Sequence, residues 1–324
     1  MIKKVLLIII VLAFFAACFF PVTLQKTTIV KSSFLNTYSF VANPSKWEQW
    51  RPDLRKALMT DSGKIIIQRD SSKFSIKYNG FKLKVDPKGN SFDINEDQDG
   101  RTRNYSFVMV PVPDKFFNKT IVSIDEKTTA INYLIDKFAP SSFLQEHLNS
   151  LKNYLETDSL YYGFNIFETA VPESYLIVMQ KEVADRDKFP EAAKILATLQ
   201  QYIITNNIKP VQPVIAQFNQ NIKDSVEVKV GFFINKEVKP GNGIQFNRMP
   251  KGGPLYAVKY KGEFSKRGKA FDALKQYFAD HSHQMVILPF ETYLDNKLPV
   301  SDSDTVSIQV NLGTFPSGGA AKPK

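Results

Sequence analysis

Two side chains in residues 289–295, Glu291 and Tyr293, have the chemistry to act together on a ligand. The stretch has the composition of a β-strand, in which successive side chains point to opposite faces. Phe290 and Leu294 then share one face, while Glu291 and Tyr293 share the other. Because a carboxylate is costly to bury alone, Glu291 must be solvated, paired or used for binding. We interpret this strand as the floor of a ligand site.

A carboxylate beside aromatic rings suits a bulky organic cation, through charge neutralisation and cation–π contacts. Further rings occur nearby at Tyr256, Tyr260 and Phe246. We predict that these three residues form aromatic walls around Glu291 and Tyr293, and that the ligand is a small hydrophobic or cationic molecule. The alternative is a salt bridge from Glu291 to a nearby lysine.

Nucleophilic and metal chemistry are not indicated. The one cysteine, Cys18, lies in an N-terminal apolar run, and His147 lies on an apolar helical stripe. His281 and His283 have no acidic neighbour that would complete a metal site. We therefore predict no catalytic residues, no metal and no cofactor, and we leave open whether the chain is an enzyme while favouring a binding protein.

The elements that must position these residues belong to a chain of 324 residues, which is enough for two domains. Its 43% hydrophobic content fits a globular protein. The formal charge of +10 comes from lysines scattered along the whole chain. Because no basic cluster is interleaved with aromatic residues, we expect no nucleic-acid partner.

The N-terminal segment is apolar. Lys3 and Lys4 precede an apolar run over residues 5–20, which Pro21 and Val22 extend. This run is just long enough to cross a bilayer. We predict that residues 1–24 form an uncleaved anchor, with the membrane as a partner through residues 5–22. A cleaved signal peptide, or a lipoprotein modified at Cys18, remains an alternative.

Residues 25–157 have the pattern of one domain. Asn43 and Pro44 predict the start of a helix, and turn signals such as Asn79-Gly80 separate antiparallel strands. An apolar stripe at helical spacing predicts a closing helix over residues 141–156. Strands are expected at residues 27–34, 64–69, 73–78, 82–86, 91–95, 102–110, 120–125 and 129–135.

This order resembles the polyketide-cyclase/START-like (SRPBCC) superfamily. The strand around Val30, residues 47–52 and the closing helix carry the resemblance. It implies a helix-grip fold, in which a curved sheet wraps a long helix around an apolar cavity. Trp47 and Trp50 would then line this second cavity, although two core tryptophans explain the pattern equally well.

Residues 160–316 contain an internal repeat. Residues 199–203 return as residues 274–278, and residues 213–218 return as residues 289–294. Each copy has one strand-like run before its helix and two after it. A strand-helix-strand-strand unit used twice predicts a domain with pseudo-twofold symmetry. The last residues, 317–324, are predicted to be a flexible tail.

The doubled unit resembles the GyrI-like, or effector-binding, domain, which occurs alone and in AraC- and MerR-type bacterial regulators. Residues 288–295 carry the most specific part of the resemblance. It implies a groove between the repeats in which a glutamate at the position of Glu291 contacts amphipathic ligands. The first repeat has Ile215 at that position, and the DNA-binding part of the regulators is absent.

The sequence therefore predicts an α+β protein with three open functions. The first is a membrane-anchored protein that senses or sequesters small molecules. The second is a hydrolase of reactive small molecules that uses Glu291. The third is a carrier of lipids or other hydrophobic ligands in the START-like cavity. We expect a bacterial plasma (inner) membrane protein that crosses once, with its folded domains outside the cytoplasm.

Overall fold

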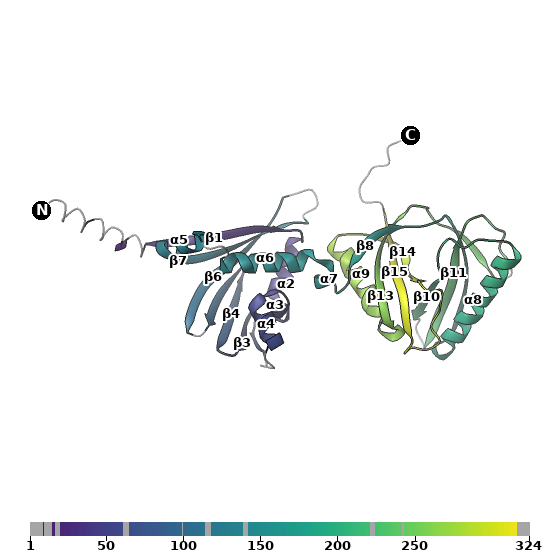
Figure 1. The fold of residues 1–324 in the computed structure, drawn as a ribbon, viewed down its shortest axis with the longest axis horizontal. Helices are drawn as coiled ribbons and strands as arrows, with labels where there is room; N and C mark the ends of the chain where they lie inside the picture. The colour runs from purple at the N-terminus through teal and green to yellow at the C-terminus, as the bar shows by residue number, and fades with distance from the viewer. Residues whose placement is uncertain are drawn as a thin grey trace, which may run out of the picture. The chain divides into compact units, whose positions relative to one another are not determined.

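The computed structural model describes residues 20–60, 65–98, 100–113, 118–138, 142–220, 224–241 and 243–315, together with residues 9, 15 and 16. The chain divides into two compact units, residues 1–157 and 158–324. Each unit combines helices with one antiparallel sheet, which confirms the predicted α+β class (Figure 1).

The first unit forms a seven-stranded sheet within the described residues. Its strands are β1 (Pro21–Val30), β2 (Ile66–Asp70), β3 (Lys73–Tyr78), β4 (Phe81–Lys88), β5 (Ser91–Gln98), β6 (Arg101–Pro111) and β7 (Thr120–Thr129). They lie in the order β1-β7-β6-β5-β4-β3-β2. Strands β4 and β5 bury every second residue over most of their length, as expected when one face of a sheet is covered.

Helices connect and cover this sheet. They are α2 (Phe34–Ala42), α3 (Pro44–Trp50), α4 (Pro52–Thr60), α5 (Ala130–Phe138) and α6 (Phe143–Glu156). Asn43 caps α3, because its side chain accepts from the backbone N–H of Ser45 and Pro44 follows it. Helix α6 packs on β1 and β7 and buries the predicted apolar stripe.

Two local predictions for the first unit were wrong. The first strand begins at Pro21, so Leu24 is buried in the sheet, and the strand ends at Val30. The expected strand over residues 129–135 is helix α5 instead. The Thr129 hydroxyl accepts from the backbone N–H of Asn132, as a helix N-cap does.

The predicted anchor over residues 5–22 lies mostly outside the described residues, and Pro21 and Val22 belong to β1. Within the part of the chain that is described, no helix is long and apolar enough to span a bilayer. The predicted tail, residues 317–324, also lies outside the described residues.

The second unit forms an eight-stranded antiparallel sheet within the described residues. Its strands are β8 (Ile166–Ala170), β9 (Tyr175–Ala184), β10 (Ile215–Gln220), β11 (Ser225–Ile234), β12 (Gln245–Arg248), β13 (Pro254–Glu263), β14 (Met285–Tyr293) and β15 (Thr305–Thr314). The helical segments are α7 (Asp158–Tyr161), η1 (Asp185–Asp187), α8 (Lys188–Thr205), η2 (Phe264–Lys266) and α9 (Gly268–Asp280).

The strand order β12-β9-β11-β10-β14-β15-β13-β8 contains the predicted strand-helix-strand-strand repeat, and each copy begins with one further strand, β8 or β12, that was not predicted. The first copy runs β8-β9-α8-β10-β11 and the second runs β12-β13-α9-β14-β15. When equivalent strands are matched, the order reads the same from both ends. The centre of this pattern is the pairing of β10 with β14. Each copy also places its first strand beside the second strand of the other copy.

Helices α8 and α9 cover one side of this sheet, which we call the helix face. Its hydrophobic cluster joins Leu199 of α8 and Leu274 of α9 to inward residues of the strands. A smaller hydrophobic cluster lies on the other side, which we call the opposite face, and it includes Phe233 and Phe290. Neighbouring residues of β14 therefore belong to different faces.

Candidate functional site

Glu291 lies at the centre of the doubled unit. Strands β10 and β14 pair only through Ile215 with Thr292 and through Ala216 with Glu291. This register places Glu291 opposite Ala216, which faces the helices, whereas Ile215 lies in the cluster on the opposite face. The position equivalent to Glu291 in the first copy is therefore Ala216, and the predicted equivalence with Ile215 was wrong by one residue. Tyr293 belongs to the hydrophobic cluster on the helix face. Glu291 lies two residues earlier in the same strand, so its side chain points to the same face. The predicted pair therefore points towards the helices.

Glu291 is buried and has two partners. Its carboxylate Oε1 accepts from Nε of Arg267 at 2.6 Å, and Oε2 accepts from the hydroxyl of Tyr293. Glu291 is 1% exposed, Tyr293 is fully buried, and the Arg267 side chain is 17% exposed. The salt bridge that the sequence left open is thus present, with an arginine instead of a lysine.

The surroundings shift the proton affinities of this pair. Burial raises the pKa of Glu291, while the neighbouring charge of Arg267 and the hydrogen bonds from Tyr293 and Arg267 oppose that rise. Burial, together with the Glu291 carboxylate, also raises the pKa of the Tyr293 phenol well above its ordinary value. Tyr293 is therefore a hydrogen-bond donor to Glu291 and keeps its own proton.

Arg267 packs on two phenylalanines, and a third phenylalanine packs against those two rings. Its guanidinium carbon is 3.5 Å from the ring centre of Phe264 and 5.8 Å from that of Phe218. The ring of Phe264 is 5.2 Å from those of both Phe189 and Phe218. Arg267 also donates from Nη1 to the carbonyl of Phe264. A carboxylate and an aromatic cluster thus hold a planar cation, and that cation belongs to the chain.

The predicted aromatic walls lie on the helix face but in different places. Tyr260 of β13 and Tyr293 of β14 both pair in register with Ile308 of β15, the strand between them. Tyr256 donates its hydroxyl to Glu168 at 2.8 Å, and Tyr260 donates to the carbonyl of Glu263.

Phe246 lies farther from the Glu291 site. It belongs to β12 and stacks on Tyr175. Strands β9, β11 and β10 separate β12 from β14, which is about 19 Å along the sheet. The structure therefore brings Glu291 and Tyr293 together and leaves the three predicted walls apart from them.

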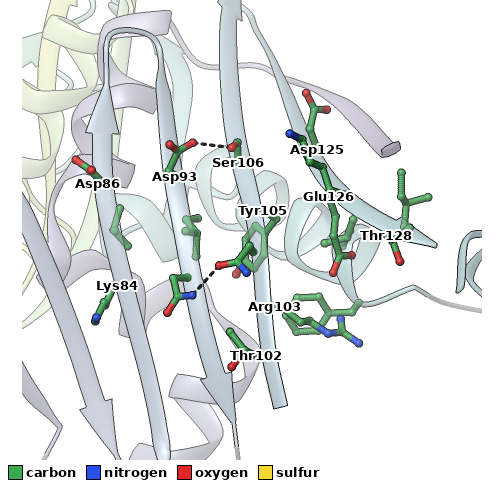
Figure 2. Close-up of a pocket in the computed structure, with 18 of the residues that line it drawn as sticks. Lys84, Asp86, Asp93, Thr102, Arg103, Tyr105, Ser106, Asp125, Glu126 and Thr128 are labelled. Atoms are coloured by element: carbon green, nitrogen blue, oxygen red, sulfur yellow. Dashed lines mark hydrogen bonds between the residues drawn. The ribbon is translucent and has the colours of Figure 1, made fainter. Parts of the chain in front are cut away.

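The first unit contains a hollow of about 1980 Å³ (Figure 2). A polar row crosses neighbouring strands along it, because Asp86 pairs with Asp93, Asp93 with Ser106, and Ser106 with Asp125. Ser106 donates to Asp93 at 2.7 Å. Apolar residues complete the lining, among them Leu24, Phe74, Val85, Ile94 and Leu144. These five residues are 1–5% exposed, so they contribute little accessible apolar surface to the hollow.

Trp47 and Trp50, predicted for this second cavity, are fully buried in the core. Their rings contact each other at 5.1 Å, and both pack against Phe107. Neither tryptophan lines the hollow. Trp47 also donates its indole N–H to the carbonyl of Val41 at 2.7 Å. The structure gives both residues the packing expected of core tryptophans.

A buried ion-pair network next to these tryptophans was not predicted. Arg51 is fully buried and makes ion pairs with Asp53 at 2.7 Å and with Glu96 at 3.0 Å. Tyr105 donates to Glu96 at 2.7 Å. Because each charge has a partner, the network holds α3, β5 and β6 together without an isolated buried charge.

His147 lies beside this network on α6. Its Nδ1 is 2.7 Å from the carbonyl of Phe143, so Nδ1 carries the proton and donates it. Burial and the charge of Arg51 lower the pKa of His147 to about 3. His147 is therefore a neutral core histidine, as its apolar stripe predicted.

The sequence interpretation missed Arg267 and its phenylalanines. Arg267 lies directly before α9, and the position equivalent to it in the first copy is near Asp187. A signal was present, because a strand glutamate that faces a helix requires a partner from the end of that helix. Several lysines lie as close in sequence, so the sequence alone does not select Arg267.

Comparison with known proteins gives partial matches. No family model and no curated protein matches the chain. The C-terminal domain of EcmrR is 16% identical, with a TM-score of 0.38, over 47% of this chain and 97% of that one. A START superfamily protein from Mycobacterium smegmatis is 16% identical, with a TM-score of 0.28, over 41% and 97%. SAV2435 bound to tetraphenylphosphonium is 8% identical, with a TM-score of 0.30, over 46% and 93%. At these scores the matches assign neither a family nor a function.

Proposed function

We propose that this chain is a small-molecule-binding protein that takes a planar organic cation at Glu291. The observation that carries the proposal is the guanidinium of Arg267, which occupies a carboxylate and phenylalanine site of the kind that binds such cations. In this proposal the Arg267 guanidinium occupies the site in the absence of ligand, as an internal occupant, and a ligand cation displaces it.

The exposure of the three groups supports this exchange. Glu291 and Tyr293 are buried, whereas the Arg267 side chain is partly exposed and is the outermost of the three. A ligand cation that enters would compensate the Glu291 charge, and Arg267 would gain hydration outside. The wild type can bind a ligand cation only in the minor state in which Arg267 has left Glu291. Its apparent affinity is therefore the intrinsic affinity multiplied by the small fraction of molecules in that state.

Calorimetric titration with benzamidinium tests the proposal, and benzamide serves as its uncharged isostere. We expect benzamidinium to bind, benzamide to bind more weakly, and Glu291→Gln to remove the difference between them. Glu263→Gln is the matched control, because Glu263 is about half exposed and pairs with Lys266 on the surface. Equal binding of both compounds to the wild type and to Glu291→Gln would refute the proposal.

A hydrolase is the second candidate, and the raised pKa of Glu291 favours it. Burial raises this pKa, which brings a carboxyl group closer to the range of a general base at neutral pH. The ion pair with Arg267 opposes this role, because it stabilises the charged carboxylate. Turnover of a reactive, ring-strained compound by the wild type, lost in Glu291→Gln, would support a hydrolase. If the wild type binds such a compound without converting it, the result would support the binding function and not a hydrolase.

A carrier of hydrophobic ligands through the first unit is supported by the size of its hollow, about 1980 Å³. Its lining combines apolar residues such as Phe74 with carboxylates such as Asp93. Native mass spectrometry of the purified chain tests this role. Retained lipid whose mass disappears in a Phe74→Asp variant would support it, whereas lipid-free protein would not.

Membrane attachment is part of the proposal. The apolar run over residues 5–20 leads into β1, and the carbonyl of Phe20 accepts from the backbone N–H of Ala130, the first residue of α5. Helix α5 exposes Ile135 and Phe138 at this point. Both features are consistent with attachment to a membrane at this end of the first unit. We further propose, from the sequence alone, a single pass through a bacterial inner membrane with the two units outside the cytoplasm. Protease added to intact spheroplasts should digest both units, and protection of both would refute this orientation.

A further inference from the structure

The opposite face of the second sheet contains a cavity of about 390 Å³. It lies where strands β10 and β14 separate. The two strands pair over only two residues each, although β10 continues to Gln220 and β14 begins at Met285. Cavities that bind small ligands are typically 300–1,000 Å³, so this one has the size of a small ligand site.

Local irregularities keep this gap open. The register of β14 with β15 shifts twice, between Met285 and Ile287 and between Ile287 and Phe290. The side-chain amide of Gln217 donates to the carbonyl of Pro289 at 2.6 Å, which satisfies a backbone acceptor that β10 does not pair. The gap is therefore a hydrogen-bonded part of the fold.

Gly231 forms part of the cavity floor and has no side chain to fill the cavity. A Cβ at this position would lie 2.6 Å from the carbonyl of Ile177 and 2.6 Å from Cγ1 of Val178. On the same strand and the same face, Lys229 lies on one side of Gly231 and Phe233 on the other. The floor thus runs from an ammonium group to an aromatic ring.

One end of the cavity is apolar. Phe233, Phe290 and Leu176 are buried there, and Met249 and Ile287 pack against them. No polar side chain is needed to bind a hydrocarbon chain at this end, because burial of apolar area is sufficient.

The other end has one cation without a partner. Lys229 is half-buried, and its ammonium makes no hydrogen bond or ion pair with any described residue. Its neighbours in register are Gln180 and Gln217, which are uncharged. Arg248 also lines the cavity, but both oxygens of Glu237 bind its guanidinium at 2.7 Å. Lys229 is therefore the cation available to a ligand.

Carboxylates occur beyond Lys229 on the same face. Glu227 lies two residues before it in β11 and pairs in register with Glu182. Among the described residues, neither forms an ion pair with Lys229, and Glu182 accepts from the hydroxyl of Ser225. They lie on the side of Lys229 away from Gly231, so a ligand anion over Gly231 meets the ammonium first.

We propose that this cavity is a second binding site, for an amphiphile with one apolar chain and one terminal carboxylate. The carboxylate pairs with Lys229, and the chain extends over Gly231 to Phe233 and Phe290. The four residue-to-residue steps from Lys229 to Phe233 span about 13 Å, which sets the length of the chain. A single ammonium group matches a monoanion.

This site is independent of Glu291. Val228 and Val230 lie in the cluster on the helix face, so Lys229 between them points to the opposite face. Glu291 and Arg267 lie on the helix side. Variants at Lys229 therefore leave the proposed cation site unchanged, and failure of one proposal does not decide the other.

Calorimetric titration of the full chain with decanoate, below its micelle concentration, tests the proposal. Decanol and decyltrimethylammonium have chains of matched length with no charge and with the opposite charge. We expect decanoate to bind best. Lys229→Met should weaken decanoate at least tenfold, as loss of a charge-assisted hydrogen bond does, whereas Lys229→Arg should retain it.

Two further variants complete the design. Lys261→Met removes an exposed lysine of β13 and should leave decanoate binding unchanged. Val286→Trp fills the cavity from its rim, where Val286 is 41% exposed and tolerates a larger side chain, and it should abolish binding of decanoate. Undiminished decanoate binding by both Lys229→Met and Val286→Trp, or equal affinity of the wild type for decanoate and decyltrimethylammonium, would overturn the proposal.

Discussion

The ion pair between Arg267 and Glu291 breaks the symmetry of the doubled unit. The pair joins the segment before α9 to β14 at 2.6 Å. In the first copy, Ala216 occupies the position of Glu291 and has no charge to make such a pair. A symmetric fold did not require this charge, because an apolar residue packs at the equivalent position. Packing alone therefore does not explain why an ion pair lies at the centre of this sheet.

Arg267→Gln should destabilise the protein. The change leaves the buried carboxylate of Glu291 without its charged partner, which costs about 3 kcal/mol, the lower end for a buried pair because Arg267 is partly exposed. Chemical denaturation monitored by circular dichroism measures the difference. Arg186→Gln is the control, since the Arg186 side chain is 87% exposed. Equal losses in the two variants would show that the pair with Glu291 contributes nothing specific.

The stability difference between the wild type and Glu291→Gln should depend on pH. Burial raises the pKa of Glu291 above its ordinary value of 4.5, so the folded protein binds this proton more tightly than the unfolded chain does. The contribution of Glu291 is fully present below about pH 4.5 and is lost as the pH rises through the folded pKa. Denaturation of both proteins from acid to neutral pH should therefore show a falling difference. A difference that rises with pH would mean that Arg267 lowers the pKa overall.

Trp47→Ala should cost about 3–5 kcal/mol, because the indole is fully buried and its removal leaves a cavity. The measurement is the free energy of unfolding of the first unit, followed by fluorescence of Trp50. Ligand uptake by the hollow should not change, since Trp47 does not line it. A small stability loss with a large change in ligand uptake would instead give Trp47 the role that the sequence predicted.

The sequence predicted which face Glu291 and Tyr293 share, because strand alternation depends only on local pattern. It did not predict the partner Arg267, which lies 24 residues away. Their contact depends on how η2 and α9 lie over the sheet, and local periodicity contains no information on that packing.

The wrong prediction of a strand over residues 129–135, where helix α5 lies, has a different cause. Thr128 and Thr129 favour a strand, and they do end β7. Beyond them, Ile131, Leu134 and Ile135 follow at helical spacing. The prediction extended the strand across this change of period. The apolar stripe is exposed rather than buried, so burial does not account for it.

A fragment of residues 20–315 should be more stable than one of residues 25–315. The shorter fragment lacks Pro21 to Leu24, which pair with β7, and Leu24 is buried. We expect a loss of about 3 kcal/mol, comparable to removal of one buried leucine. Thermal denaturation compares the fragments, and Leu24→Ala in the longer one isolates the side chain. Equal stability of all three would place the edge of the folded core after residue 24.

The most direct test of the central claim is binding of benzamidinium to Arg267→Ala and to the double variant Arg267→Ala, Glu291→Gln. If Arg267 is an internal occupant, its removal frees the Glu291 site, and benzamidinium should bind at least tenfold more tightly than to the wild type. The added Glu291→Gln change should then abolish this gain, and the dependence of binding on the charge of the compound should disappear with it. An Arg267→Ala variant that stays folded and binds benzamidinium no better than the wild type, or a gain that survives in the double variant, would contradict the account.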